Sequence, residues 1–247
     1  MCAPSASPDC IARYGPCEGL LSTIASPSAI VRRPIHFVIV AAGLLAAGPG
    51  CKTRVPSLDA PFADSFDRAE LGADWHDTGH GASIKDGKLN LVRAYNHPVW
   101  LRRKLTRNVQ IDFDAVSRSP AGDLKVELFG DGESFDDDKG RYDPTSYMIV
   151  MGGWHNSKSI ISRLGEHDEA VKVARDRTGA EPLVTPGKTY HFTVTRRGGA
   201  IDWKIDGAPY LAWNDPEPLG GPGHEFFAIN DWEADVSFDN LTIRPVE

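Results

Sequence analysis

The stretch TYHFTVTRRGGAIDWKIDGAPYLAW, residues 189–213, decides the fold class of this 247-residue chain. Apolar and polar residues alternate along it, and two turns at Gly198-Gly199 and Asp206-Gly207 interrupt the alternation. A period of two predicts half-buried strands, and Gly-Gly or Asp-Gly pairs between such runs predict hairpins. We therefore expect consecutive antiparallel strands here.

The same pattern continues over most of the chain. Short alternating runs bounded by turn residues extend from Pro61 onward, and they include VQIDFDAVS, DLKVELFGD and VSFDNLTIRP. Ten or more such strands without helical periodicity predict an all-β sandwich or barrel. We expect one domain over residues 61–247, since about 190 residues are ample for a single core, with a short tether over residues 52–60 before it.

The segment before this domain has the features of an export signal. Residues 31–51 read VRRPIHFVIVAAGLLAAGPGC, with two arginines, a short apolar run and small residues before Cys51. This order is typical of a secretory signal, and the apolar run is too short for a permanent membrane span. Residues 1–30 resemble neither a signal nor a domain, and we expect them to be a mis-called extension, with translation starting near Val31.

Cysteine usage and charge narrow the class of protein. The four cysteines lie at positions 2, 10, 17 and 51, so the domain has none to pair. Residues 1–51 carry three of the 27 basic and two of the 34 acidic residues, which leaves 24 against 32 and a charge of −8. An acidic domain without a basic stripe argues against nucleic acid as a partner. The sequence does not indicate an oligomeric state.

Two resemblances extend this interpretation. Cys51, after the signal run, is similar to the lipid-modified cysteine of bacterial lipoproteins, although Gly48 and Pro49 depart from the usual residues there. That resemblance implies export across the inner membrane and a lipid anchor, with the protein in the periplasm or at the cell surface. FADSFDRAELGADW (62–75), APYLAW and VSFDNLTIRPVE (236–247) resemble the concanavalin A-like lectin and glucanase superfamily over residues 61–246. This second resemblance implies a two-sheet antiparallel jelly roll whose terminal strands pair.

The segment GGWHNSKSIISRLGEHDE, residues 152–169, carries the densest chemistry. Its Gly-Gly-Trp start, followed by Asn156 and Arg163, resembles a bacterial group of that superfamily with roles in polysaccharide use. Laminarinase-type enzymes of this fold carry E-x-D-x-x-E or E-x-D-x-E on one strand, whereas here Glu169 follows Glu166-His167-Asp168 directly. In a strand Glu169 then points to the opposite face from Glu166, so the pair of carboxyl groups that a retaining enzyme needs is not formed.

Two interpretations of this segment stay open. It is either a charged hairpin turn, or a strand on which Arg163 and His167 share a face. In the second case Arg163 clamps a sugar carboxylate and His167 transfers a proton. Glu127, in DLKVELFGD, completes a candidate catalytic set, since alternation places it with Lys125 and Phe129 on the ligand-facing side. A solvent-facing ion pair is the alternative role for Glu127.

Aromatic and acidic residues suggest binding sites. Sugar rings stack on aromatic faces while polar neighbours bind the hydroxyl groups, and the candidates of this kind are Trp100, Arg102, Trp154, His155, Asn156 and Trp232. Trp75 and Trp203 fit the core better, and for Trp100 and Trp154 a core position is the alternative. The loop GDGESFDDDKGRYD offers oxygen ligands for Ca²⁺ at Asp131, Glu133, Asp136 and Asp138, but lacks the EF-hand order, so a solvated acidic loop is the alternative.

The expected function is carbohydrate binding on the concave face of the jelly roll, at the cell envelope, with an acidic polysaccharide as one candidate ligand. A glycoside hydrolase or lyase on the same fold is the second interpretation, and a structural or adhesion protein without a glycan ligand is the third. No cofactor is required by any of them, with Ca²⁺ as the one candidate. Whether the protein turns over a substrate stays open.

Overall fold

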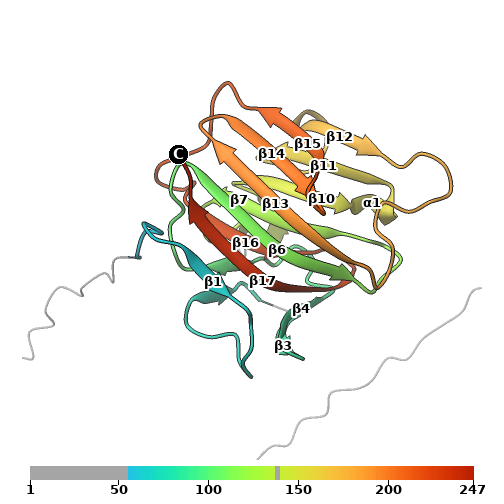
Figure 1. Cartoon of the computed structure of the whole chain (residues 1–247), viewed down its shortest axis with the longest axis horizontal. Coiled ribbons are helices and arrows are strands. Elements are labelled where there is room, and N and C mark those ends of the chain that lie inside the picture. The colour runs from blue at the N-terminus through green and yellow to red at the C-terminus, as the bar shows by residue number, and fades with distance from the viewer. Residues whose placement is uncertain (1–54, 80, 137–139) are drawn as a thin grey trace, which may run out of the picture. The chain divides into compact units, whose positions relative to one another are not determined.

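The computed structural model describes residues 55–79, 81–136 and 140–247, apart from the side chain of Asp136. The signal segment, Cys51 and most of the tether lie outside these residues. No helix among the described residues is long and apolar enough to cross a membrane. Nearly all regular structure is β, as the alternating pattern predicted (Figure 1).

Two antiparallel sheets form a sandwich, with the strands of one crossing those of the other in Figure 1. The eight-stranded sheet has the order β15 (Ala208–Asn214), β14 (Ala200–Ile205), β13 (Thr189–Arg197), β6 (Val109–Ser117), β17 (Asp235–Pro245), β4 (Lys88–Val92), β3 (Ala82–Lys85), with β1 (Phe62–Asp64) also paired to β17. The seven-stranded sheet has the order β12 (Val171–Asp176), β11 (Lys158–Arg163), β10 (Tyr147–Gly152), β7 (Leu124–Gly130), β16 (Phe226–Asn230), β5 (Val99–Leu101), β2 (Trp75–Asp77).

The hairpins and the terminal pairing follow the sequence expectations. β13, β14 and β15 pair in succession around the two glycine turns of the opening stretch. β1 and β17 lie side by side, with Phe62 opposite Ile243, although about 180 residues separate them. The resemblance-based prediction that the ends of the domain pair is therefore confirmed.

The core lies between the sheets and consists of the inward-facing residues of both. β6 shows the expected alternation, since every second residue from Val109 to Ser117 is buried. Trp75 and Trp203 are both buried in the core, as predicted. Burial of this apolar area supplies the main stabilisation, at roughly 25 cal/mol per Å².

The central strands β7 and β10 of the seven-stranded sheet are buried along their whole length. Their outward-facing side chains are covered because a second, smaller apolar cluster of Met148, Val150 and Ile160 lies on that face, with Tyr142 packed against it. Tyr142 comes from β9 (Arg141–Tyr142), which pairs with β8 (Phe135–Asp136) as a separate hairpin. The outer face of this sheet is therefore partly covered by other residues rather than fully open to water.

Candidate functional site

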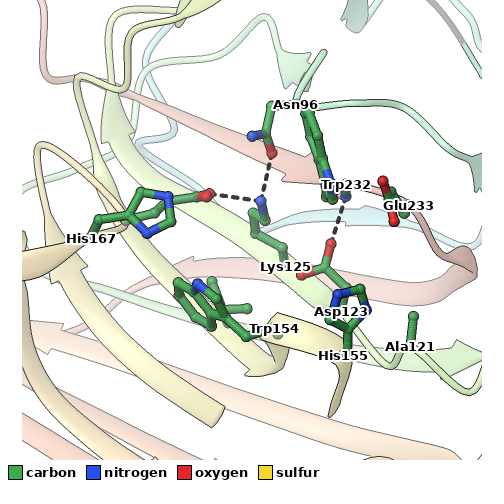
Figure 2. Close-up of a pocket in the computed structure, with 12 residues that line it drawn as sticks. Asn96, Ala121, Asp123, Lys125, Trp154, His155, His167, Trp232 and Glu233 are labelled. Atoms are coloured by element: carbon green, nitrogen blue, oxygen red, sulfur yellow. Dashed lines mark hydrogen bonds and ion pairs between the residues drawn. The ribbon is translucent and has the colours of Figure 1, made fainter. Parts of the chain in front are cut away.

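A groove opens on the outer face of the seven-stranded sheet. It consists of two adjoining cavities of about 390 and 750 Å³, which share Asn96, Glu166, His167 and Trp232. The smaller cavity is also lined by Ala121, Asp123, Lys125, Val150, Gly153, Trp154, His155 and Glu233. Figure 2 shows this smaller cavity, with Lys125 and Asp123 between Trp154 on one side and Trp232 on the other.

The floor of the groove is a buried ion pair. Lys125, on β7, is only 2% exposed, and its Nζ donates to Glu166 Oε1 at 2.7 Å and to Asn96 Oδ1 at 2.6 Å. Burial alone would lower the pKa of Lys125, but the carboxylates of Glu166 and Asp123 outweigh it and raise the pKa. The ammonium group therefore stays charged and fixes Glu166, from the loop after β11, over the floor.

Glu127 lies beneath the groove rather than in it. Its side chain is 0% exposed, and both carboxylate oxygens are used within the protein. The four donors and their distances to the carboxylate are Ser146 Oγ (2.6 Å), Tyr142 OH (2.7 Å), Asn230 Nδ2 (2.9 Å) and Ser134 Oγ (3.2 Å). Burial raises the pKa of Glu127, and the Ser146 and Tyr142 hydrogen bonds oppose that rise. The expected exposed carboxylate is thus a buried structural one that links strand, loop and hairpin.

One wall of the groove is a left-handed turn, α1 (Gly153–Asn156). Trp154, His155 and Asn156 have φ of 51°, 55° and 61°, a conformation that costs roughly 1–2 kcal/mol per non-glycine residue. The turn presents the Trp154 ring, 36% exposed, edge-on to the His167 ring at 5.7 Å between centroids. A strained backbone that persists at a cavity wall is typical of functional sites.

Asn156 holds this turn in place. Its amide donates to Val184 O at 2.6 Å and to Pro120 O at 3.2 Å, and its Oδ1 accepts from Val184 N at 2.8 Å. Gly152, which precedes the turn at φ 69°, leaves room for this contact, because a Cβ there would lie 2.7 Å from Asn156 Oδ1. The predicted ligand-binding role of Asn156 therefore fails geometrically, since its amide is buried and fully engaged by backbone.

The opposite wall carries Tyr95 and Trp232, which are 45% and 46% exposed. Their rings meet edge-on at 5.2 Å. They lie on two loops that are hydrogen-bonded to each other, since Tyr95 N donates to Trp232 O at 3.0 Å. Trp232 N in turn donates to Asp123 Oδ2 at 2.6 Å. This wall is thus fixed to the floor by a carboxylate.

A second carboxylate, Asp231, supports the same wall from within. Its Oδ1 accepts from Ala94 N at 2.7 Å, whereas Oδ2 is buried without a hydrogen bond from any described residue. Burial raises the pKa of Asp231 to about 7. Burial also raises the pKa of Asp123, and Lys125 and the Trp232 N–H oppose that rise.

The expected set of Glu127, Arg163 and His167 does not converge. Arg163 pairs with Tyr147 across the strands, and therefore faces the core side of the sheet. There its Nε donates to Asp215 Oδ2 at 3.1 Å and its Nη2 to Glu217 O at 3.2 Å. His167 does line the groove, but from the loop beyond β11, where strand alternation no longer determines direction.

The other predicted residues divide in the same way. Trp154, His155 and Trp232 line the smaller cavity together. Trp100 is 1% exposed and donates from Nε1 to Glu133 O at 3.0 Å, so it is a covered residue rather than a platform. Arg102 is exposed but lies at a different hollow, beside Trp100 and His76.

Phe129 departs from the alternation of side chains expected along β7. It adopts φ 60°, and its ring lies in the core under the Arg196 guanidinium, 3.9 Å from the ring centroid. The neighbouring strand β16 has an irregular register at Phe226/Phe227. Phe129 therefore does not share the groove face with Lys125.

The acidic loop is used locally. Asp131 Oδ1 accepts from the backbone N–H groups of Glu133 and Ser134 at 2.8 and 3.0 Å, which shapes a turn. Within the described ranges no three His, Cys, Asp or Glu side chains are grouped to hold a metal. Asp138 and the side chain of Asp136 lie outside those ranges, so the Ca²⁺ site stays a prediction.

Sequence reasoning did not select as site residues the side chains that do most to build the groove: Tyr95, Asn96, Asp123, Lys125, Glu166 and Glu233. Lys125 and Glu166 are 41 positions apart and meet only through the β10–β11 hairpin. Alternation did place Lys125 on the outer face, which was the one available signal. Tyr95 and Asn96 come from an irregular loop and had none.

The two stacked antiparallel sheets, the paired terminal strands and the groove on an outer sheet face define a concanavalin A-like jelly roll. Solved structures of this fold include a protein of unknown function with a galectin-like fold from Bacillus subtilis, with 16% identity and a TM-score of 0.54 over 74% of this chain and 94% of that one. A β-1,3-1,4-glucanase (lichenase) from a mouse hindgut metagenome has 11% identity and a TM-score of 0.51 over 75% and 99%. The Emp47p carbohydrate recognition domain has 12% and 0.51 over 76% and 95%.

The sequence comparisons say less. A family model described as farnesoic acid O-methyl transferase matches residues 134–241, fewer than half of the chain. None of the curated proteins compared with the chain matches it. At these identities the solved structures establish the fold alone.

Proposed function

We propose that the protein binds carbohydrate in the groove on the outer face of the seven-stranded sheet. The observation that carries the proposal is the placement of three exposed aromatic rings, Tyr95, Trp154 and Trp232, around a polar floor. Aromatic faces of this kind stack on sugar rings, and the amide and carboxyl groups of the floor can bind hydroxyl groups. A glucanase and a carbohydrate recognition domain among the solved structures of this fold support the same class of ligand.

The dimensions and chemistry of the groove suit an extended ligand. The two cavities adjoin through Asn96 and Glu166, and each falls within the size range of ligand sites, about 300–1,000 Å³. Arg163, the group expected to bind an acidic polysaccharide, faces away from the groove and pairs with Asp215. The arginine expected to clamp an acidic ligand is therefore not part of this site.

A glycan array with the protein and two variants tests the proposal. Trp154→Ala and Trp232→Ala should each weaken binding by on the order of 1–3 kcal/mol, the range for loss of one stacking platform. Val92→Ala is the matched control, since Val92 is an exposed apolar side chain that lines neither cavity. Absence of binding to any glycan, or binding that both tryptophan variants leave unchanged, would support the structural or adhesion role instead.

A glycan-cleaving enzyme is the second candidate. Asp123 and Glu166 line one cavity near Lys125, and burial raises the pKa of Asp123 while Lys125 is hydrogen-bonded to Glu166. Two carboxyl groups in different surroundings, one with its pKa raised by burial and one held by an ammonium group, are the arrangement that general acid and base chemistry needs. Release of reducing ends or unsaturated products that Glu166→Gln abolishes would establish turnover. Binding without product release would leave the binding function.

We also propose that the protein is a lipoprotein anchored through Cys51, in the periplasm or at the cell surface. The signal-like segment 31–51 supports this, and Cys51 is the one cysteine after its apolar run. Cys51→Ser should release the protein from the membrane fraction or leave the precursor uncleaved. Membrane fractionation of the processed variant as a lipoprotein would contradict the anchor, and a peptide from residues 1–30 in the native precursor would contradict a start near Val31.

A further inference from the structure

The charge around the smaller cavity is predominantly negative. Asp123, Glu166 and Glu233 line it, whereas Lys125 is its only Lys or Arg among the described residues. Glu127 adds a further buried carboxylate below the floor. A ligand that enters this cavity therefore meets more carboxyl groups than ammonium groups.

The ammonium group of the cavity is already engaged. Lys125 is 2% exposed, and its Nζ is bound to Glu166 at 2.7 Å and to Asn96 at 2.6 Å. A carboxylate on a ligand would have to displace Glu166 from this pair or remain beside Asp123 and Glu233 without a cation. Either costs free energy, because a buried charge without a partner is strongly unfavourable.

Asp123 is the buried carboxyl group of the cavity wall, and one of its two oxygens is unused by the described residues. It is 8% exposed, and its Oδ2 accepts from Trp232 N at 2.6 Å. Its Oδ1 accepts no hydrogen bond from any residue in the described ranges, although the residue lines the cavity. A carboxyl oxygen without a protein donor, on a mostly buried side chain at a cavity wall, fits a donor that the ligand brings.

We propose that the groove recognises an amino sugar with a free ammonium group, which donates to Asp123 Oδ1 between Trp154 and Trp232. This inference rests on the proposed carbohydrate function and deepens it. Carboxylates and aromatic faces attract the same kind of group, since a cation gains from Coulomb attraction and from the ring quadrupole together. A neutral sugar makes the stacking contacts without this gain, and a uronate meets like charge.

The test is a glycan array with immobilised neutral, uronate-containing and glucosamine-containing oligosaccharides. The pH is kept near neutrality, because burial raises the pKa of Asp123 and acidic pH would remove its charge. Glucosamine oligomers should bind about tenfold or more tightly than their N-acetylated or glucose counterparts of equal length, a factor typical of one charge-assisted hydrogen bond. Uronate oligomers should bind most weakly. The preference should shrink as salt rises, because charges at an open cavity are screened.

Two variants assign the preference to a residue. Asp123→Asn keeps an acceptor for Trp232 N–H and removes the charge, so the preference for glucosamine over glucose oligomers of equal length should fall to about twofold or less. Asp202→Asn is the matched control, because it removes the same charge from an exposed position on β14, in the other sheet. It should leave the preference intact. Circular dichroism on both variants checks that the fold is retained.

The outcomes separate this inference from the proposed function. If no glycan of any charge class binds, the carbohydrate function itself fails. If glycans bind but uronates bind best, or glucosamine and glucose oligomers bind equally, the function stands and the amino-sugar inference is overturned. A preference that survives Asp123→Asn would likewise overturn the role of Asp123.

Discussion

The two walls of the groove present their tryptophans by different physical means. Trp154 stands on a strained left-handed turn that a neutral amide, Asn156, holds through three hydrogen bonds. Trp232 stands on a loop that two carboxyl groups, Asp123 and Asp231, hold from below. The position of the first wall depends on neutral hydrogen bonds alone, whereas the position of the second also depends on whether its two carboxyl groups are protonated. Similar exposed rings can thus respond differently to the same change of conditions.

The largest expected effect is on the amide-held wall. Asn156→Ala removes three buried hydrogen bonds and leaves the backbone groups of Pro120 and Val184 without partners, which should lower the free energy of unfolding by about 3–6 kcal/mol. Urea denaturation measures it. Ser157→Ala, which removes an exposed hydrogen bond to Trp154 O, is the control and should cost under about 1 kcal/mol. Equal losses in the two variants would show that the turn does not need the amide.

The carboxylate-held wall should respond to pH. Burial raises the pKa of Asp231 from 3.8 to about 7, with Asp123 and Asp235 opposing its ionisation and Lys125 favouring it. Between these two values the folded protein holds a proton that the unfolded chain has lost, so the free energy of unfolding falls as pH rises from about 4 to about 7.

Asp231→Asn should remove that slope. The variant keeps an acceptor for Ala94 N–H and should be more stable than the wild type by on the order of 2–4 kcal/mol at about pH 8, with little difference at about pH 4. Denaturation midpoints across the pH range measure this. A variant that is less stable than the wild type at every pH would mean that Asp231 is ionised and stabilising in the folded protein.

Removal of the rings themselves tests what the walls share. Trp154→Ala and Trp232→Ala should leave stability within about 1 kcal/mol of the wild type, because both side chains are more than a third exposed. Glycan affinity should fall by about 1–3 kcal/mol in each. Calorimetric titration and thermal melts separate the two quantities. A stability loss of about 3–5 kcal/mol would identify the ring as core instead.

The smallest effect is expected at Arg163. Arg163→Lys keeps the positive charge near Asp215 but loses the planar guanidinium group with its several N–H donors. This change should lower the free energy of unfolding by under about 1 kcal/mol. Glycan affinity should not change, because Arg163 faces the core side of the sheet. Weaker binding of acidic sugars alone in this variant would place Arg163 back at the ligand and contradict the groove described above.

The sequence predicted the architecture better than the site for a physical reason. Alternation and turn residues act locally, so the hairpins of β13–β15 and the core positions of Trp75 and Trp203 could be inferred. The groove depends on tertiary pairing. Lys125 meets Glu166 across three strands, and Trp232 N–H meets Asp123 between two loops.

Local rules also misled where the backbone leaves the regular conformation. Phe129 adopts a positive φ and turns its ring to the core, against the parity of its strand. Asn156 stands beside Trp154 in a sequence that reads as a ligand-binding motif, yet its amide is used by distant backbone. The local sequence predicts neither the left-handed turn nor the hydrogen bonds of Asn156 that hold it, because the partners at Pro120 and Val184 are remote.

The position of β17 has a consequence for how the chain matures. This strand, the last along the described chain, lies inside the eight-stranded sheet, paired with β6 on one side and with β4 and β1 on the other. While it is still missing from a growing chain, β6 and β4 have unsatisfied edges and cannot pair with each other in the native order. Contacts this distant in sequence make folding slow. The nascent domain should therefore remain without its complete sheet until β17 has been synthesised, which leaves time for chaperones to hold it as an incompletely folded chain.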